Sequence, residues 1–305
     1  MAHSVQLTVA PPLARQGPGP IVGELLEALD LVLARRVAEA LPGDRRSAGV
    51  GPGTELVQLR PYEIGDDVRH IDAAATARTG TPHVRLHVPE RSLTTWIVLD
   101  ISPSMAFGTA RRLKADVAEG VVTVLGRLAV RRAGSVGLVT FGDGEVRVHP
   151  PRGSRPGIVA LRRVISEGVA TDGASDPHGL AGALRKVGLL AKRPGLVVVV
   201  TDFRGEEDWL TPIGALRLRH SVIAAEITDP RELELPAVGR LAVIDPETGQ
   251  RLDIDTSNSR VRRRFKELEA ERRAELHREL RRLRVDHVAL STDGDWLLEL
   301  GRELA

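Results

Sequence analysis

The run from Leu196 to Val200, in "GLVVVVTDF", limits the fold of this chain more than any other stretch. A strand with one face in water alternates apolar and polar residues, whereas this run is apolar throughout. Such a run is typical of a central strand in a parallel sheet that helices cover on both faces. From Thr94 onward, further apolar strands alternate with helical patterns. The sequence therefore predicts an α/β fold with a doubly wound, mostly parallel sheet.

The order of the expected elements follows from this alternation. Strands are predicted at "TTWIVLD", "SVGLVTFG", "EVRVHP", "GLVVVVTDF", "SVIAAEI" and "DHVALS". Helices are predicted near residues 109–130, 156–166, 179–191, 209–218 and 259–284, and in the closing segment "DWLLELGREL". The segment "RLAVIDPETGQRLDID" has the pattern of a hairpin.

The first part of the chain has a different pattern. A Pro/Gly-rich lead at 11–20 precedes a helical pattern over 21–41, which "GDRRSAGVGPG" then breaks. This glycine-rich segment lacks both the Gly-Lys-Ser/Thr ending of a phosphate loop and a preceding strand, so we interpret it as a linker. Residues 54–88 are β-like and charged. We therefore expect residues 1–92 to form an N-terminal helix, a linker and a small β-rich subdomain, and residues 93–305 to form the α/β domain.

Composition narrows the chemistry. With 305 residues and 42% hydrophobic content, the chain can build a large core with a smaller attached domain. Cysteine is absent, which excludes thiol catalysis, thiolate metal sites and disulfides. A net charge of +2 and only 3% aromatic residues argue against nucleic-acid binding. The N-terminus lacks a basic leader and no run is long enough to cross a bilayer, so we expect a cytoplasmic protein without a membrane span.

Oxygen-bearing side chains follow two of the predicted strands. In "IVLDISPSM", Asp100, Ser102 and Ser104 lie just past the end of one strand, and Asp202 lies just past the end of another. Doubly wound sheets bind ligands at the carboxyl ends of their strands, so we expect these side chains to face one crevice. Carboxylate and hydroxyl oxygens suit a hard divalent cation, Mg²⁺ first, with Mn²⁺ or Ca²⁺ as alternatives. A nucleophile or phosphate site is the competing interpretation.

This pattern carries a resemblance to a known kind of site. The stretch "DISPS" resembles the Asp-x-Ser-x-Ser signature of the metal-ion-dependent adhesion site in von Willebrand factor A domains, and "VTDF" resembles the aspartate-bearing strand end of the same site. The resemblance implies an A-like fold and a third loop that supplies a hydroxyl. In "GVATDGASDPHGLAGAL", Thr171 fits the usual residue type and Ser175 fits the spacing to the next helix, so both are candidates.

A second resemblance concerns the segment before the α/β domain. "RPYEIGDDVRHID", at 60–72, is similar to the Arg-x-Tyr-x-x-Gly-Asp-Asp-x-Arg-x-Ile-Asp hallmark of the bacterial family known as domain of unknown function fifty-eight. The family usually has tryptophan after Ile-Asp, where this chain has Ala73. The resemblance implies that the protein works beside MoxR-type AAA+ ATPases in chaperone-like assembly or metal insertion.

The charges of this segment have two interpretations. Asp66, Asp67 and Asp72 are interleaved with arginines such as Arg60 and Arg69, and guanidinium and carboxylate groups form bidentate pairs. We expect a network that pins the β-rich subdomain to the A-like domain rather than a catalytic set. A surface for a partner is the alternative.

Two functions follow from the predicted site. An interaction module would use the metal to bind a Glu or Asp of a MoxR-type ATPase or of its client. A metal-dependent hydrolase or phosphotransferase would use Asp100 or Ser102 as nucleophile. No histidine follows the strand, no Gly-x-Ser-x-Gly elbow occurs, and no second acid stands two residues after Asp100. We therefore favour the interaction module and expect no enzymatic activity.

Overall fold

The computed structural model describes residues 15–40, 55–88, 93–131, 134–172 and 176–304. The chain divides into two compact units. The large unit comprises residues 1–41 and 93–305, and the small unit comprises residues 42–92.

A six-stranded sheet forms the centre of the large unit. Its strands stand in the order β10, β7, β6, β3, β4, β5, and all neighbours are parallel except β4 and β5. Their bounds are Thr94–Asp100 for β3, Ser135–Phe141 for β4, Arg147–Gly153 for β5, Leu196–Thr201 for β6, Ser221–Thr228 for β7 and Asp286–Ser291 for β10. The chain enters at β3, winds outward through β4, and reverses direction at β6. This order confirms the predicted doubly wound α/β fold.

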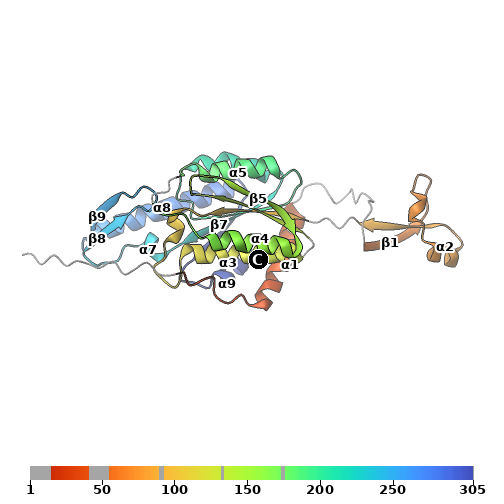
Figure 1. Ribbon diagram of the computed structural model, residues 1–305, viewed down its shortest axis with the longest axis horizontal. Helices are drawn as coiled ribbons and strands as arrows, with labels where there is room; N and C mark the ends of the chain where they lie inside the picture. The colour runs from red at the N-terminus through yellow and green to blue at the C-terminus, as the bar shows by residue number, and fades with distance from the viewer. Residues whose placement is uncertain (1–14, 41–54, 89–92, 132–133, 173–175, 305) are drawn as a thin grey trace, which may run out of the picture. The chain divides into compact units, whose positions relative to one another are not determined.

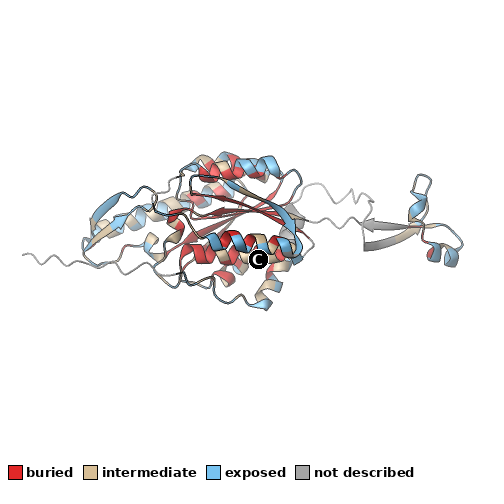
Figure 2. Cartoon of the chain, in the orientation of Figure 1, coloured by how far each residue is buried: buried red, intermediate tan, exposed pale blue. Residues whose placement is uncertain are grey.

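Helices cover both faces of the sheet (Figure 1). One face packs against α1 (Gly23–Ala40), α3 (Lys114–Arg131), α4 (Ser154–Glu167) and α9 (Trp296–Leu304), and the other against α5 (Gly179–Leu190), α6 (Leu210–Arg217) and α8 (Ser259–Arg282). Successive residues of a strand point to opposite faces. In β3, Ile97 therefore joins one core and Val98 the other. Every residue of β6 is buried, as its apolar run predicts. The centre of the sheet has the colour of buried residues in Figure 2.

The helix α1 belongs to the large unit, so the expected grouping of residues 1–92 does not hold in its first part. Leu29 of α1 is buried in the core under α3 and α9, and Leu25 packs beside it. The preceding segment is also attached to this unit, because the carbonyl of Pro18 accepts hydrogen bonds from Arg112 and from the indole of Trp296. The apolar stripe of the helix therefore covers the α/β core.

The small unit is not entirely β. Its strands β1 (Glu55–Pro61) and β2 (His83–Val88) pair antiparallel, and a 3₁₀ turn and the helix α2 (Ala73–Thr79) lie between them. Asp72 caps α2, since its carboxylate accepts a hydrogen bond from the backbone N–H of Ala75 at 2.7 Å. Arg60 pairs with Asp66 at 2.8 Å. These acidic residues stabilise turns and pairs inside the unit.

Three further elements shape the end of the large unit where the strands finish. The predicted hairpin is confirmed as β8 (Arg240–Ile244) and β9 (Arg251–Asp255), which pair antiparallel. The short helix α7 (Pro230–Leu233) follows β7. The helix predicted from Thr109 begins five residues later, at Lys114, because the backbone and hydroxyl of Thr109 bond to Asp229 instead.

Candidate metal centre

The two predicted aspartates lie at the point where the strand order reverses. Asp100 ends β3, and Asp202 directly follows the neighbouring strand β6. Both are buried, with exposed fractions of 5% and 3%. Crevices at such switch points are the usual ligand sites of doubly wound sheets.

The loop after β3 brings both serines to the same place. The backbone N–H of Ser102 donates to Asp100 Oδ1 at 2.8 Å, and a 3₁₀ turn over Pro103–Ala106 then folds the chain back. Ser102 Oγ lies 3.0 Å from Ser104 Oγ, and Ser104 Oγ donates to Asp202 Oδ2 at 2.9 Å. A continuous chain of oxygen atoms therefore joins the ends of β3 and β6.

Gly142, just after β4, makes room for this loop. Its φ is +106°, a conformation that side-chain-bearing residues rarely adopt. A Cβ added there would lie 2.6 Å from the backbone nitrogen of Ser102 and 2.7 Å from its Cβ. The position of Ser102 thus depends on a glycine from the neighbouring strand.

The predicted third loop is only partly placed. The backbone N–H of Ala170 donates to the carbonyl of Ile101 at 2.7 Å, so this loop runs beside the first one. Thr171 is exposed, and Ser175 lies outside the described residues. The structure therefore brings Asp100, Ser102, Ser104 and Asp202 together and leaves the third-loop ligand as a prediction.

A buried lysine completes the site, and the sequence analysis missed it. The ammonium of Lys114 lies 2.7 Å from Asp202 Oδ2 and 2.7 Å from Glu232 Oε1, and its side chain is 0% exposed. Val117 follows Lys114 by about one helical turn and Val121 follows it by about two, and both are buried. Lys114 therefore lies on the apolar stripe of α3. A lysine on such a stripe is the signal that would have found it.

The other partner of Lys114 is positioned by α7. Asp229 caps this helix, and the backbone N–H of Asp229 donates in return to Glu232 Oε2 at 3.1 Å. Arg204 also reaches Glu232, at 3.4 Å, while its backbone N–H donates to Asp202 Oδ1 at 3.1 Å. Glu232 is therefore held by the capping box and shared between two cations.

The two aspartates titrate in opposite directions. Burial and the neighbouring charge of Asp202 raise the pKa of Asp100 to about 7, although hydrogen bonds from Ser102 and Thr201 act against this rise. Burial also acts to raise the pKa of Asp202, but the ammonium of Lys114 outweighs it and holds that pKa below its usual range. Lys114 therefore keeps Asp202 ionised, while no cation among the described residues forms an ion pair with Asp100.

The β8–β9 hairpin carries Glu247, a third carboxylate whose pKa the centre affects. Burial and the charge of Asp202 raise the pKa of Glu247, and the two serine hydroxyls partly oppose that rise. Nothing in "DPETGQ" indicated this influence, because it depends on the fold of the hairpin.

The donor set fits a hard divalent cation. It consists of carboxylates and hydroxyls, which Mg²⁺ and Mn²⁺ prefer, and it carries more negative charge than Lys114 balances. Across the described ranges, no group of three or more histidine or acidic side chains is arranged to hold a metal by itself. A cation held here would therefore need hydroxyl ligands, and Ser102 and Ser104 lie between the two aspartates.

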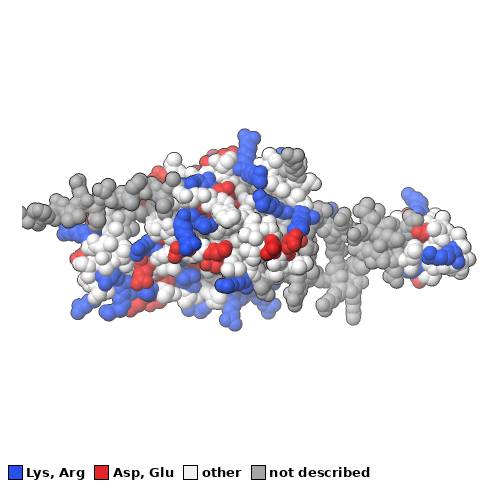
Figure 3. Space-filling model, turned by 90° about the horizontal axis from the view of Figure 1, so that it is seen from below, with Lys and Arg blue, Asp and Glu red and all other residues white. Residues whose placement is uncertain are grey.

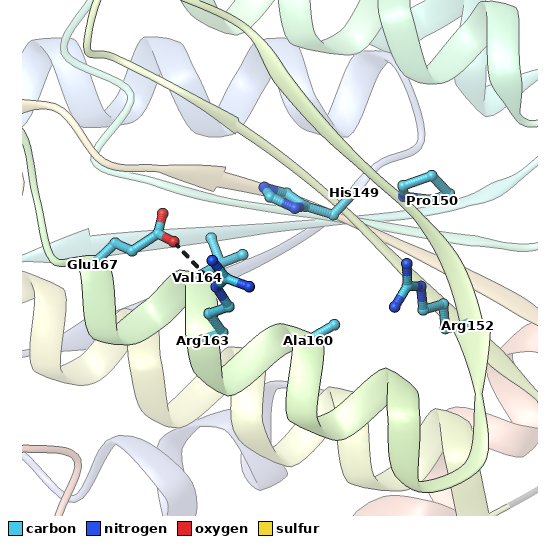
Figure 4. Close-up of a pocket in the computed structure, with 7 residues that line it drawn as sticks. All are labelled: His149, Pro150, Arg152, Ala160, Arg163, Val164 and Glu167. Carbon is cyan, nitrogen blue, oxygen red and sulfur yellow. Dashed lines mark ion pairs between the residues drawn. The ribbon is translucent and has the colours of Figure 1, made fainter.

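Other surface features lie away from this centre. A cavity of about 340 Å³ opens between β5 and α4 (Figure 4) and is lined by His149, Pro150, Arg152, Ala160, Arg163, Val164 and Glu167. It includes none of the predicted ligands.

On the face in Figure 3, basic and acidic side chains are interspersed, without one continuous basic field. Among the described residues, no helix is both long enough and apolar enough to span a membrane.

Comparison with known protein families tests the family resemblance that the 60–72 segment suggested. A family model described as "Protein of unknown function DUF58" matches residues 58–275. The chain belongs to the DUF58 family. The DUF58 match includes most of the small unit's described residues, both aspartates of the centre and the β8–β9 hairpin.

Two relatives and two solved structures are similar to this chain. The uncharacterized proteins Rv1480 of Mycobacterium tuberculosis and Mb1516 of Mycobacterium bovis are each 35% identical, over 97% of this chain and 94% of the relative. Among solved structures, the conserved hypothetical protein BatB of Bacteroides thetaiotaomicron has 14% identity and a TM-score of 0.43, over 70% of this chain and 97% of that chain. The SpRpn10 VWA domain has 14% identity and a TM-score of 0.32, over 44% and 75%.

Proposed function

We propose that this DUF58 protein is a metal-dependent protein-interaction module. A divalent cation would be held by Asp100, Ser102, Ser104 and Asp202, with Thr171 or Ser175 from the third loop. It would bind a carboxylate of another protein at a coordination position that the chain leaves open. The observation that carries this proposal is the chain of oxygens from Ser102 through Ser104 to Asp202, at 3.0 Å and 2.9 Å.

The charge balance supports a cation at this place. Asp100 and Asp202 are both buried, and of these two carboxylates Lys114 contacts only that of Asp202. Two carboxylates that share one buried site cannot both ionise without compensation, and the raised pKa of Asp100 reflects this. A divalent cation would supply the missing positive charge and favour the ionised form of Asp100.

The same contacts argue against a nucleophilic aspartate. Asp100 Oδ1 accepts from the N–H of Ser102 at 2.8 Å, and Asp100 Oδ2 accepts from Thr201 Oγ1 at 2.5 Å. Both oxygens are therefore engaged in fixing the loop and the strand end, which suits a structural ligand better than an attacking group. A metal-dependent hydrolase or phosphotransferase at this site stays the alternative hypothesis.

The partner belongs to the proposal as well. We expect a MoxR-type AAA+ ATPase, or its client, to present a Glu or Asp to the centre in chaperone-like assembly or metal insertion. This expectation rests on the family resemblance of the 60–72 segment, and the expected cytoplasmic location would bring such partners together. The interspersed surface charges provide rim contacts that set orientation more than affinity.

Capture from a native lysate tests the proposal. The wild-type chain is used as bait with Mg²⁺ and with chelator, beside Asp100→Ala and the surface control Asp253→Ala, whose side chain is 65% exposed. We expect one set of partners to be lost with chelator and with Asp100→Ala, and retained with Asp253→Ala. Recovery of the same partners under all conditions would place the interaction elsewhere on the surface.

A further inference from the structure

A cavity of about 570 Å³ opens between the helices α3 and α4 and the segment that leads into α1. Its volume lies within the range of pockets that hold small molecules. Figure 1 shows α3 and α4 side by side on one face of the sheet. None of the residues that line the cavity is a predicted ligand of the metal centre. The lining includes Ile21, Glu119, Thr123, Arg127, Arg162 and Ile165.

The segment before α1 forms one wall of the cavity and is firmly attached. Asp116 of α3 is fully buried, and its carboxylate accepts a hydrogen bond from the backbone N–H of Gly17 at 3.0 Å. Arg15 donates to the carboxylate of Glu119 on α3 at 2.6 Å and to the carbonyl of Ile165 on α4 at 3.3 Å. Arg15 therefore joins the two helices at one end of the cavity, and the chain's own contacts hold the wall in place.

The other end of the cavity lies about two turns further along α3, where the two helices approach closely. A Cβ added to Gly126 of α3 would lie 2.4 Å from Leu161 Cδ1 of α4, so the absence of a side chain at Gly126 permits this approach. Arg127 and Arg162 directly follow these two residues, and both line the cavity. Two guanidinium groups from facing helices therefore lie at the same end of the cavity.

The positive charge at this end is not balanced within the part of the chain that the structure describes. No carboxylate there forms an ion pair with Arg127 or Arg162. The one acidic residue in the described lining, Glu119, is already paired with Arg15 at 2.6 Å. Thr123 adds a hydroxyl about one turn before Arg127, on the same face of α3. Arginine donates parallel pairs of hydrogen bonds to phosphate, so this arrangement favours a phosphate group.

Apolar side chains line the cavity between its two ends. Ile165 of α4 is buried in the core, and Ile21 packs against the same core from the segment before α1. We propose that the cavity binds a small organic phosphate, whose phosphate group lies between Arg127 and Arg162 and whose apolar part contacts Ile21 and Ile165. The metal centre takes no part in this inference, so either proposal can fail while the other stands.

Calorimetric titration of the full chain with phenyl phosphate, which joins an aromatic ring to one phosphate group, tests this proposal. Wild type is compared with Arg127→Gln, Arg162→Gln and the control Arg163→Gln. The control removes the same charge from the next position on α4, where the side chain is 85% exposed and lies outside this cavity. We expect saturable binding to wild type and binding at least about tenfold weaker to each of the first two variants. The control should bind within about twofold of wild type, because solvent and salt screen an exposed charge.

Inorganic phosphate serves as a second probe for the two parts of the site. It can bind the guanidinium groups but has no apolar part, so wild type should bind it at least about tenfold more weakly than phenyl phosphate. Ile21→Ala should weaken the binding of phenyl phosphate alone. Equal affinity of wild type for both probes would overturn the organic class of ligand. Absence of saturable phenyl phosphate binding to wild type, or the same loss in Arg163→Gln as in Arg127→Gln, would overturn the site itself.

Discussion

Replacing Asp100 with Asn should change how the stability of the metal-free protein depends on pH. Burial and the charge of Asp202 raise the pKa of Asp100 from 3.8 to about 7. The unfolded chain therefore releases this proton at a lower pH than the folded chain does. Stability is lost as the pH rises from about 4 through about 7, and the loss levels off above that range. Asn does not ionise, so Asp100→Asn should remove this loss.

The size of the effect follows from the two pKa values. Their separation corresponds to about 4 kcal/mol in the free energy of unfolding, at about 1.4 kcal/mol per pKa unit. Part of this change is already complete at about pH 5.5. Between about pH 5.5 and about pH 8.5 the free energy of unfolding should therefore fall by about 2 kcal/mol. Asn preserves the contacts, because its carbonyl can accept from the N–H of Ser102 and its amide can donate to Thr201 Oγ1.

Urea denaturation in the presence of chelator measures this difference. Wild type should lose about 2 kcal/mol more than Asp100→Asn between about pH 5.5 and about pH 8.5. Adding Mg²⁺ at the higher pH should restore stability to wild type and have little effect on Asp100→Asn. If the two proteins lost stability in parallel over this range, the assignment of a raised pKa to Asp100 would be refuted.

Three further substitutions test other parts of the site. Lys114→Met leaves the buried carboxylate of Asp202 and the half-buried one of Glu232 without their shared ammonium, and it should cost about 3–5 kcal/mol in urea denaturation. The exposed control Lys266→Met should cost less than about 1 kcal/mol. Gly142→Ala should lower the thermal midpoint more than Gly144→Ala, since both have positive φ but only Gly142 lies against the serine loop. Thr171→Ala should weaken Mn²⁺ binding in calorimetry if it supplies the third-loop ligand, and unchanged binding would assign that role elsewhere.

Much of the fold could be predicted from local patterns. The apolar run of β6 required burial on both faces, and the alternation around it required a parallel sheet with crossover helices. That topology alone placed Asp100 and Asp202 at one edge, since both follow strands whose carboxyl ends meet there. Period-2 and period-3.6 patterns are short-range signals, and they located these elements well.

The residues that the sequence analysis missed act over long distances in the chain. Lys114 meets Asp202 across 88 residues and Glu232 across 118 residues, and no local pattern encodes such pairings. The helix α1 was grouped with the following segment by sequence proximity, but its apolar stripe buries Leu29 in the distant α/β core.

Calorimetric titration of Mn²⁺ into the chelator-treated full chain, with wild type compared with Ser104→Ala, tests directly whether a cation binds at this centre. Ser104 links the two strand ends, and its loss removes one hydroxyl donor without removing a charge. We expect saturable binding to wild type and binding at least about tenfold weaker to Ser104→Ala. No binding to wild type, or the same binding curve for both proteins, would contradict it.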